Sequence, residues 1–340
     1  APQPRDGARR SRLIHRGTSR SDGAMAHADG PNAVRVVVAA MAGNLAIALM
    51  KFVAAALSGS VAILAEGVHS VADTANQALL LLGMRLARVQ DPARHPFGRA
   101  KERYFWGFIV ALVLFSLGGV FAIYEGVHKL LASEHGETSP LYAVIVLVVS
   151  LGFELSSFTV AWREFKKARG SRGLWAALFQ GKDPTIPIVL LEDGGALLGL
   201  LIALVAVVTA WVTGSVVPDA IGSIAIGLLL GAIGLLLARD TRSLLIGEGV
   251  TPEVARELTE LAEGTPGVEA VTQLLSYHLG PHTVVLALKV RFPRRETCER
   301  IEAITNDLEA RIRAARPEVE RIFVEADGTY DATQDRSLHP

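Results

Sequence analysis

Three ionisable residues lie in one apolar stretch of the chain, LAEGVHSVADTANQALLLLG, from Leu64 to Gly83. They are Glu66, His69 and Asp73, at positions i, i+3 and i+7, which share one face of an α-helix. At the centre of a bilayer each such group costs roughly 2.5–3.5 kcal/mol, so three on one face need a compensating partner. A divalent cation would supply it, although His and Asp at i, i+4 could also bond each other or a neighbouring helix. We predict a metal or proton role for this face.

A second acidic pair, Glu192 and Asp193, lies in the apolar stretch IVLLEDGGALLG. Adjacent residues point about 100° apart on a helix, and at least one of these acids must face the interior of a bundle. The two glycines that follow permit a close helix approach. Asp193 together with His69 and Asp73 gives three candidate metal ligands, and Glu192 or Glu66 could add a fourth.

Three further charged residues interrupt the apolar runs. Lys51 and Glu125 lie near the ends of their runs, and we predict that their side chains reach back to the membrane surface. Glu154 lies deeper. It is a candidate proton carrier or the partner of a hydroxyl such as Ser157, and the sequence does not separate these alternatives.

The composition limits the kinds of metal site. Of the 340 residues 50% are hydrophobic, and Cys298 is the one cysteine. A single cysteine forms neither an internal disulfide nor a Cys-based zinc site, which leaves His and carboxylates as ligands. The net charge is zero and says nothing about nucleic acid. We expect no nucleic-acid partner.

Six apolar runs are each long enough to cross about 30 Å of hydrocarbon as a helix. The runs are 34–57, 61–85, 104–131, 141–162, 186–212 and 217–237. Basic residues gather in 85–103 and 163–182, whereas the loops at the opposite end carry almost none. By the positive-inside rule these basic loops and both termini are cytosolic. We expect a multi-pass integral protein of a bacterial cell membrane, without a signal peptide.

The chain changes character after Gly247. Thr251 and Pro252 are typical of a helix start, and alternating residues from Thr283 to Phe292 predict a half-buried strand. Further elements are expected as strands over 271–278 and 322–326 and as an amphipathic helix over 301–312. The order αββαβ predicts a compact α+β domain.

These elements divide the chain into four parts. We predict a disordered segment over 1–32, a six-helix transmembrane domain over 33–247, a cytosolic α+β domain over 248–328 and a disordered tail over 329–340. The predicted fold class is therefore an α-helical membrane protein followed by a small α+β domain.

Several motifs resemble one family. HSVAD from His69, HPFGRAKERYFW from His95, the six helices and the αββαβ tail are similar to the cation diffusion facilitators, which are metal/proton antiporters. Within that family, DPTIPIVLLEDGGALLG and DAIGSIAIGLLLG are most similar to the zinc transporter 9-like branch. The resemblance covers about residues 34–327 and implies the family's copper-chaperone-like fold for the tail.

The resemblance also implies a transport site of four His and Asp residues, an i, i+4 pair from each of two helices. Carried onto this sequence, the four positions fall on His69, Asp73, Val189 and Asp193. Val189 departs from the pattern, because many members have His there. Glu192 or Glu66 then becomes the candidate for the fourth ligand.

In the tail, the resemblance implies dimerisation and, in some members, metal sensing. Lys289 and Phe323 stand at positions where a ligand His can occur, while Glu325 keeps an acid. We therefore expect the tail to support a homodimer rather than to sense metal.

The sequence as a whole predicts a secondary transporter that exports a divalent cation, Zn²⁺ foremost, in exchange for protons through a midplane His/Asp site. Mn²⁺ or Fe²⁺ export is an alternative, because oxygen-rich sites accept these ions. Alternatives from other classes are an intramembrane metal-dependent hydrolase, although HExxH and GxGD patterns are missing, and a scaffold with a vestigial site. We expect no enzymatic activity and no cofactor, since metal is the cargo and H⁺ the coupling ion.

Overall fold

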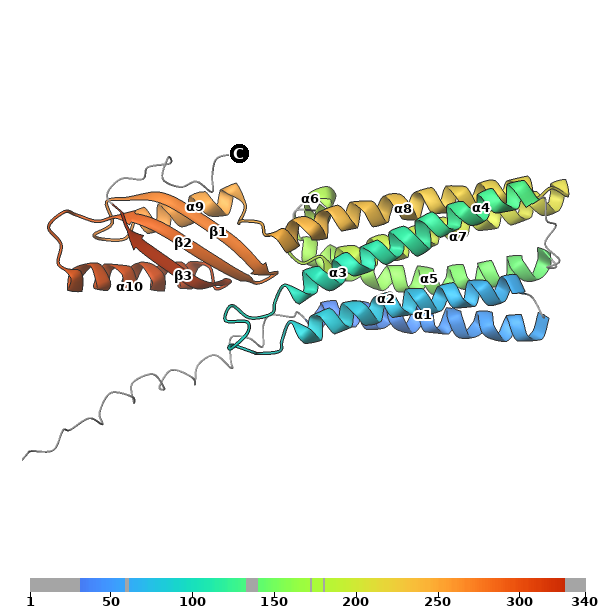
Figure 1. The fold of residues 1–340 in the computed structure, drawn as a ribbon, viewed down its shortest axis with the longest axis horizontal. Coiled ribbons are helices and arrows are strands. Elements are labelled where there is room, and N and C mark those ends of the chain that lie inside the picture. The colour runs from blue at the N-terminus through green and yellow to red at the C-terminus, as the bar shows by residue number, and fades with distance from the viewer. Residues whose placement is uncertain (1–30, 59–60, 133–139, 172, 180, 328–340) are drawn as a thin grey trace, which may run out of the picture.

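A computed structural model describes residues 31–327 of the chain, except 59–60, 133–139, 172 and 180 (Figure 1). For the helical residues 31–32, 57–58, 61–66, 68–69, 132 and 140 it describes the backbone alone. Residues 1–30 and 328–340 lie outside the described ranges, and so the two predicted disordered segments stay predictions.

Most of the chain before Gly247 is helical. The helices are α1 (Pro31–Ser58), α2 (Val61–Leu86), α3 (Glu102–Val113), the π-helical η2 (Leu114–Val120), α4 (Phe121–Ala132), α5 (Pro140–Arg169), the short α6 (Leu174–Phe179), α7 (Thr185–Thr213) and α8 (Val217–Ile246). Five spans are long and apolar enough to cross a membrane, namely α1, the continuous run α3–η2–α4, α5, α7 and α8. The protein is therefore a multi-pass membrane protein. The sixth predicted span coincides with α2, whose side chains are only partly described.

The helices extend further than the apolar runs predict. Helix α5 continues to Arg169 instead of residue 162, and α8 continues to Ile246 instead of residue 237. Both extensions carry charged residues that water can solvate, so a helix can continue beyond the hydrocarbon. The sequence patterns did not indicate η2 or α6.

Contacts between neighbouring helices arrange the bundle as a ring. Around it, α1 contacts α2, α2 contacts α3, α3 contacts α8, α8 contacts α7, α7 contacts α5, and α5 contacts α1. Glycines bring two of these helices very close: a Cβ added at Gly119 would lie 2.7 Å from Gly231 Cα, and one added at Gly126 would lie 2.7 Å from the Ala220 carbonyl oxygen. Small residues of this kind drive helix association in lipid through close backbone packing.

The outer surface of the bundle is apolar. Leu49 and Val53 of α1 and Leu228 and Leu235 of α8 are all more than half exposed. Polar side chains, among them Asn76, lie buried within the bundle instead. Apolar outside and polar inside is the arrangement expected of helices surrounded by lipid.

The C-terminal domain has the predicted αββαβ order. Its elements are α9 (Pro252–Glu263), β1 (Ala270–Gly280), β2 (Thr283–Arg291), α10 (Cys298–Ala315) and β3 (Val319–Ala326). Strand β2 lies in the centre of the sheet, antiparallel to β1 and parallel to β3, and α10 forms the crossover that a parallel pair needs. Leu258 of α9 and Leu308 of α10 pack against alternate β2 residues such as Leu286 and Leu288. The domain therefore has a core of its own.

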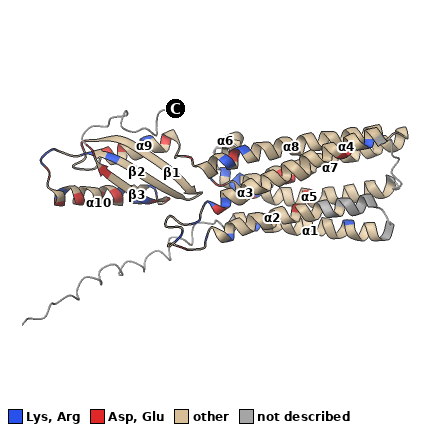
Figure 2. Cartoon of the chain, viewed as in Figure 1, with Lys and Arg blue, Asp and Glu red and all other residues tan. Residues whose placement is uncertain are grey.

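Charged side chains mark one end of the bundle. Figure 2 shows Lys and Arg gathered where the bundle meets the C-terminal domain, which is the end that carries both sequence-predicted basic loops. We refer to the opposite end, where α1 and α4 finish and α5 begins, as the far end (Figure 1).

Candidate metal site between α2, α5 and α7

Asp193 points into the bundle and is 1% exposed. The Ser157 hydroxyl of α5 donates a hydrogen bond of 2.7 Å to Asp193 Oδ2. The rotation of α7 follows from its packing on α8: a Cβ added at Gly195 would lie 2.7 Å from Ile233 Cδ1, so only glycine allows this approach. With Gly195 against α8, Asp193 faces α5.

Glu192 is also buried, and it faces α2. Its Oε1 accepts a hydrogen bond of 2.9 Å from Asn76 Nδ2, and its Oε2 accepts one of 2.6 Å from Gln77 Nε2. Both donors are neutral amides, so the carboxyl group is held in place without a cation. Sequence reasoning missed Asn76 and Gln77, although amides three and four residues after Asp73 on an apolar helix were a usable signal.

The Asp73 carboxylate of α2 lies within electrostatic range of acids on α5 and α7. Its charge acts on Glu192 and Asp193 of α7 and on Glu154 of α5. Asp73, which is half-buried, therefore lies on a side of α2 from which its charge reaches acids of α5 and α7. Asp73, Glu192 and Asp193 thus lie around one polar region between α2, α5 and α7.

The other half of the predicted ligand set is only partly described. At Glu66 and His69 the helical backbone of α2 is described and the side chains are not, so their part in the site stays a prediction. Among the side chains that are described, no three His, Cys, Asp or Glu groups lie close enough to hold a metal ion. Val189 lies one turn before Asp193 on α7 and is fully buried.

The prediction that Lys51 reaches the membrane surface is wrong. Lys51 is 5% exposed, and its ammonium group donates a hydrogen bond of 3.0 Å to the buried hydroxyl of Ser70 on α2. The close contact between α1 and α2 turns the side chain inward, since a polar partner there offsets the cost of burial. Glu125 is half exposed and pairs with Lys129 at 3.1 Å near the far end.

The two alternatives for Glu154 are now separated in part. Ser157 gives its hydroxyl proton to Asp193, so it does not serve as a donor to Glu154. Glu154 is buried, and its Oε2 has no hydrogen-bond partner among the described residues.

A polar junction joins the bundle to the C-terminal domain. Lys182 pairs with Glu248 at 2.5 Å, and Lys101 donates to the Leu245 carbonyl at 3.0 Å. Partial burial acts against ionisation of Glu248, but hydrogen bonds and the Lys182 charge lower its pKa. Burial first, and then the Lys182 charge, lower the pKa of His278 on β1. The junction therefore holds Glu248 charged and His278 neutral at pH 7.

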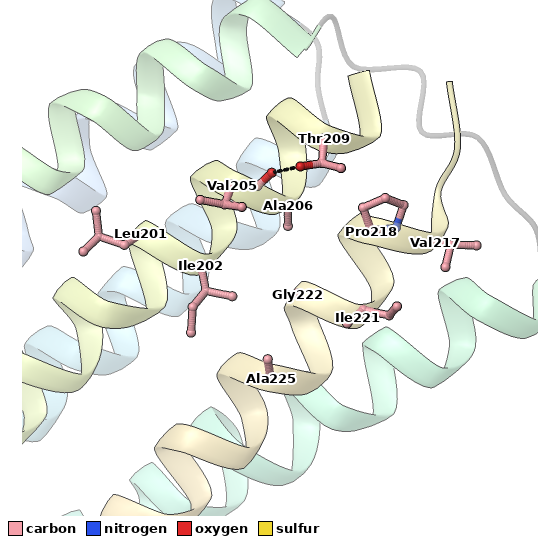
Figure 3. A pocket seen from close by; sticks show the side chains of 10 residues that line it. All are labelled: Leu201, Ile202, Val205, Ala206, Thr209, Val217, Pro218, Ile221, Gly222 and Ala225. Atoms are coloured by element: carbon pink, nitrogen blue, oxygen red, sulfur yellow. Dashed lines mark hydrogen bonds between the residues drawn. The ribbon is translucent and has the colours of Figure 1, made fainter. Parts of the chain in front are cut away.

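A cavity of 570 Å³ lies between the far halves of α7 and α8 (Figure 3). Its lining is apolar apart from Thr209, whose hydroxyl donates to the Val205 carbonyl at 2.7 Å. No titratable residue lines it, and it cannot hold a cation by coordination. The acids around Asp193 remain the candidate site.

The fold and the site define a class. Membrane-spanning helices surround buried acids and lead into a small α+β domain, which is the arrangement that the sequence resemblance implied. The family model described as the cation efflux transmembrane domain matches residues 37–246, more than half of the chain. The protein belongs to the cation efflux family.

Particular relatives narrow the comparison. The chain is 34% identical over 264 residues to the Proton-coupled zinc antiporter SLC30A9, mitochondrial, of Xenopus laevis, which covers 77% of this chain and 47% of that protein. It is 34% identical over 260 residues to Metal tolerance protein C4 of Arabidopsis thaliana, covering 76% of this chain and 57% of the relative. Magnetosome protein MamB of Magnetospira sp. is 24% identical over 237 residues, 70% of this chain and 75% of that protein. The chain spans about half the length of the first relative, and the resemblance to the zinc transporter 9-like branch is confirmed.

Proposed function

We propose that the protein is a secondary transporter that moves Zn²⁺ out of the cytosol in exchange for protons. One observation carries the proposal: Glu192 and Asp193 are buried inside a membrane bundle, where their hydrogen bonds come from neutral donors, and the half-buried Asp73 of α2 lies within electrostatic range of both. Two adjacent buried acids with neutral hydrogen-bond donors are a costly arrangement among lipid-facing helices, and a divalent ion would relieve that cost. Family membership and a relative named as a proton-coupled zinc antiporter support the same conclusion.

The ligands in this proposal are His69, Asp73 and Asp193, with Glu192 as the fourth and Glu66 as its alternative. Glu192 would give up one of its two amide hydrogen bonds to reach the ion. Imidazole and carboxylates bind metal only when deprotonated, and so protons that arrive from the far end compete the ion off. Alternating access of the bundle around a midplane site makes this competition vectorial.

Flux in proteoliposomes tests the function. In vesicles of purified protein, an imposed pH gradient with an acidic lumen should drive Zn²⁺ uptake, and the lumenal pH should rise as protons leave. A protonophore should abolish this driven uptake. Uptake that ignores both the gradient and the protonophore would replace antiport with uniport. Faster transport of Mn²⁺ or Fe²⁺ than of Zn²⁺ would change the cargo, because affinity order alone does not fix selectivity. Substrate cleavage without flux would point to a hydrolase.

We further propose that the basic end of the bundle and the C-terminal domain face the cytosol of a bacterial cell. The support is the gathering of Lys and Arg at that end (Figure 2). Cys298 is exposed and is the one cysteine of the chain, so it reports the orientation directly. A membrane-impermeant maleimide should label it in inverted vesicles and not in intact cells. The reverse pattern would invert the topology.

The C-terminal domain is proposed to support a homodimer without metal. Lys289, at a position where relatives can carry a ligand, lies 3.8 Å from Glu325 and 3.9 Å from Asp327. Phe323, at another such position, is 53% exposed and offers apolar surface to a partner. Full-length protein in detergent should therefore have the mass of a dimer by light scattering in the presence of a chelator. A monomer that dimerises only with Zn²⁺ would contradict this proposal.

A further inference from the structure

A stripe of polar residues on α5 runs away from the candidate site. Ser150, Glu154 and Ser157 lie at i, i+4 and i+7 and therefore share one helix face. All three are buried, with exposures of 1%, 7% and 6%. Ser157 donates to Asp193, so the stripe begins at the site and continues along α5 beyond it.

The stripe leads toward the far end of the bundle. Helix α5 begins there at Pro140, and at 1.5 Å per residue Ser150 lies about 15 Å and Glu154 about 21 Å from that start. Ser157 lies about 26 Å from it, beside Asp193. Glu154 therefore stands between the candidate site and the end from which protons would enter in the proposed exchange.

Two buried oxygens of the stripe have no hydrogen-bond partner in the part of the chain that the structure describes. They are Ser150 Oγ and Glu154 Oε2. A buried polar atom left unpaired costs about 1–3 kcal/mol, and buried water molecules usually satisfy such atoms. The two oxygens lie one turn apart on the same face, so water molecules or a proton between them would satisfy both.

The charges that face Glu154 belong to three other helices. Asp193 of α7 and Asp73 of α2 repel its carboxylate, and Lys51 of α1 attracts it. A divalent cation held by Asp73 and Asp193 would cancel the repulsion, which would favour loss of a proton from Glu154. Metal in the site and a proton on Glu154 therefore oppose each other through these charges.

We infer that Glu154 is the proton-transfer residue of the exchange, outside the metal ligands; this rests on the proposed function. Glu154 takes up a proton from water on the far side. Its O–H bond then breaks as Ser157, directly or through one water molecule, accepts the proton, while the Ser157 hydroxyl gives its own proton to Asp193. One O–H bond forms at Asp193 for the one lost at Glu154, and no electrons are transferred. Protonated Asp193 releases the ion.

Two transport assays on Glu154→Gln test this inference. In proteoliposomes, Zn²⁺ uptake driven by a pH gradient should fall by about 100-fold, the lower range of what a positioned proton-transfer group contributes. Exchange of labelled for unlabelled Zn²⁺ without a gradient should change by less than about twofold, because the ligands stay in place. Glu154→Asp, which keeps a carboxyl group, should recover part of the driven uptake.

Glu164→Gln is the matched control. Glu164 is also a buried acid of α5, but it pairs with Lys167 at 2.7 Å near the basic end. This variant should retain both activities. Glu164 thus controls for the loss of one buried acid from the same helix.

Each outcome decides a different point. If wild-type protein shows no uptake driven by the gradient, the proposed function itself fails. If it does, and Glu154→Gln keeps that uptake, the inference is overturned. Loss of metal exchange together with driven uptake in Glu154→Gln, while Glu154→Asp restores neither, would make Glu154 a ligand or a structural residue and would also overturn it.

Discussion

The two buried acids of the candidate site, Glu192 and Asp193, have neutral hydrogen-bond partners, whereas acids of the C-terminal domain pair with cations. In the C-terminal domain, carboxylates pair with cations at the surface, as Asp307 does with Arg311 at 2.8 Å and Glu309 with Arg313 at 2.8 Å. In the bundle, Glu192 and Asp193 are at most 5% exposed, and the hydrogen bonds to them come from amides and a hydroxyl.

The difference separates a structural acid from one that can bind an ion. An exposed ion pair contributes about 0–1 kcal/mol, since water and salt screen it, and it has no need of a further cation. A buried acid with neutral partners keeps its desolvation cost, and an arriving cation can recover part of that free energy. Both regions contain Asp and Glu, so residue type does not distinguish them. The presence or absence of a cationic partner beside the acid does.

Removing the acid at the centre of the site should have the largest effect. We expect Asp193→Asn to lower Zn²⁺ transport by about 100-fold or more, because an amide is a poor zinc ligand while the Ser157 hydroxyl can still donate to it. Asp219→Asn on α8, whose native acid pairs with Lys129 at 3.1 Å, is the control and should stay within about twofold. Wild-type transport by Asp193→Asn would place the ion elsewhere. Flux in proteoliposomes measures both variants.

Glu192→Gln should have an intermediate effect. The new amide would turn an NH₂ group toward Asn76 or Gln77, so one hydrogen bond is lost at about 1–3 kcal/mol, and a negative charge is lost as well. We expect Zn²⁺ affinity, measured by calorimetry at fixed pH, to weaken by about tenfold. The double variant with Gln77→Glu returns the charge to the neighbouring helix. Full recovery of affinity there would show that Glu192 acts through its charge and does not coordinate the ion.

Two sequence features, periodicity and the cost of acids in lipid, were enough to predict the long helices and the strands, but not η2 or α6. The β2 alternation and the inward position of Asp193 followed from them, and the structure agrees. The inward turn of Lys51 was not predictable, because it depends on Ser70 of another helix. A sequence pattern predicts which residues share one face of a helix, but it does not predict which residues of another helix pack against that face.

The sequence also could not predict that Glu192 faces α2 while the adjacent Asp193 faces α5. Glu192 and Asp193 point about 100° apart, so both can face inward, toward different helices. The packing of Gly195 on Ile233 sets the rotation that sends one acid to α2 and the other to α5. Such a contact between distant residues leaves no local pattern.

Val189→His tests whether the site lacks one ligand. Val189 lies one turn before Asp193, so an imidazole there would lie on the same face of α7. We expect Zn²⁺ to bind about tenfold more tightly, or by roughly 1.4 kcal/mol, and the preference over Mn²⁺ to increase. Val189 is fully buried, and Val189→Leu controls for the packing strain of a larger side chain. Unchanged selectivity in Val189→His would mean that the ion lies away from this face.

The smallest effect is expected in the C-terminal domain, where the acids already have a cation. Lys289 is 28% exposed as a side chain and lies 3.8 Å from Glu325 and 3.9 Å from Asp327. Lys289→Met keeps the length of the side chain and removes its charge, which should cost about 0–1 kcal/mol of stability in a denaturant titration and leave Zn²⁺ transport unchanged. If charge balance is what separates the two regions, the freed acids at the surface should bind Zn²⁺ weakly at most, since water already solvates them. A tight Zn²⁺ site created by Lys289→Met, or a loss of transport with the fold intact, would show that this part of the domain takes part in metal handling.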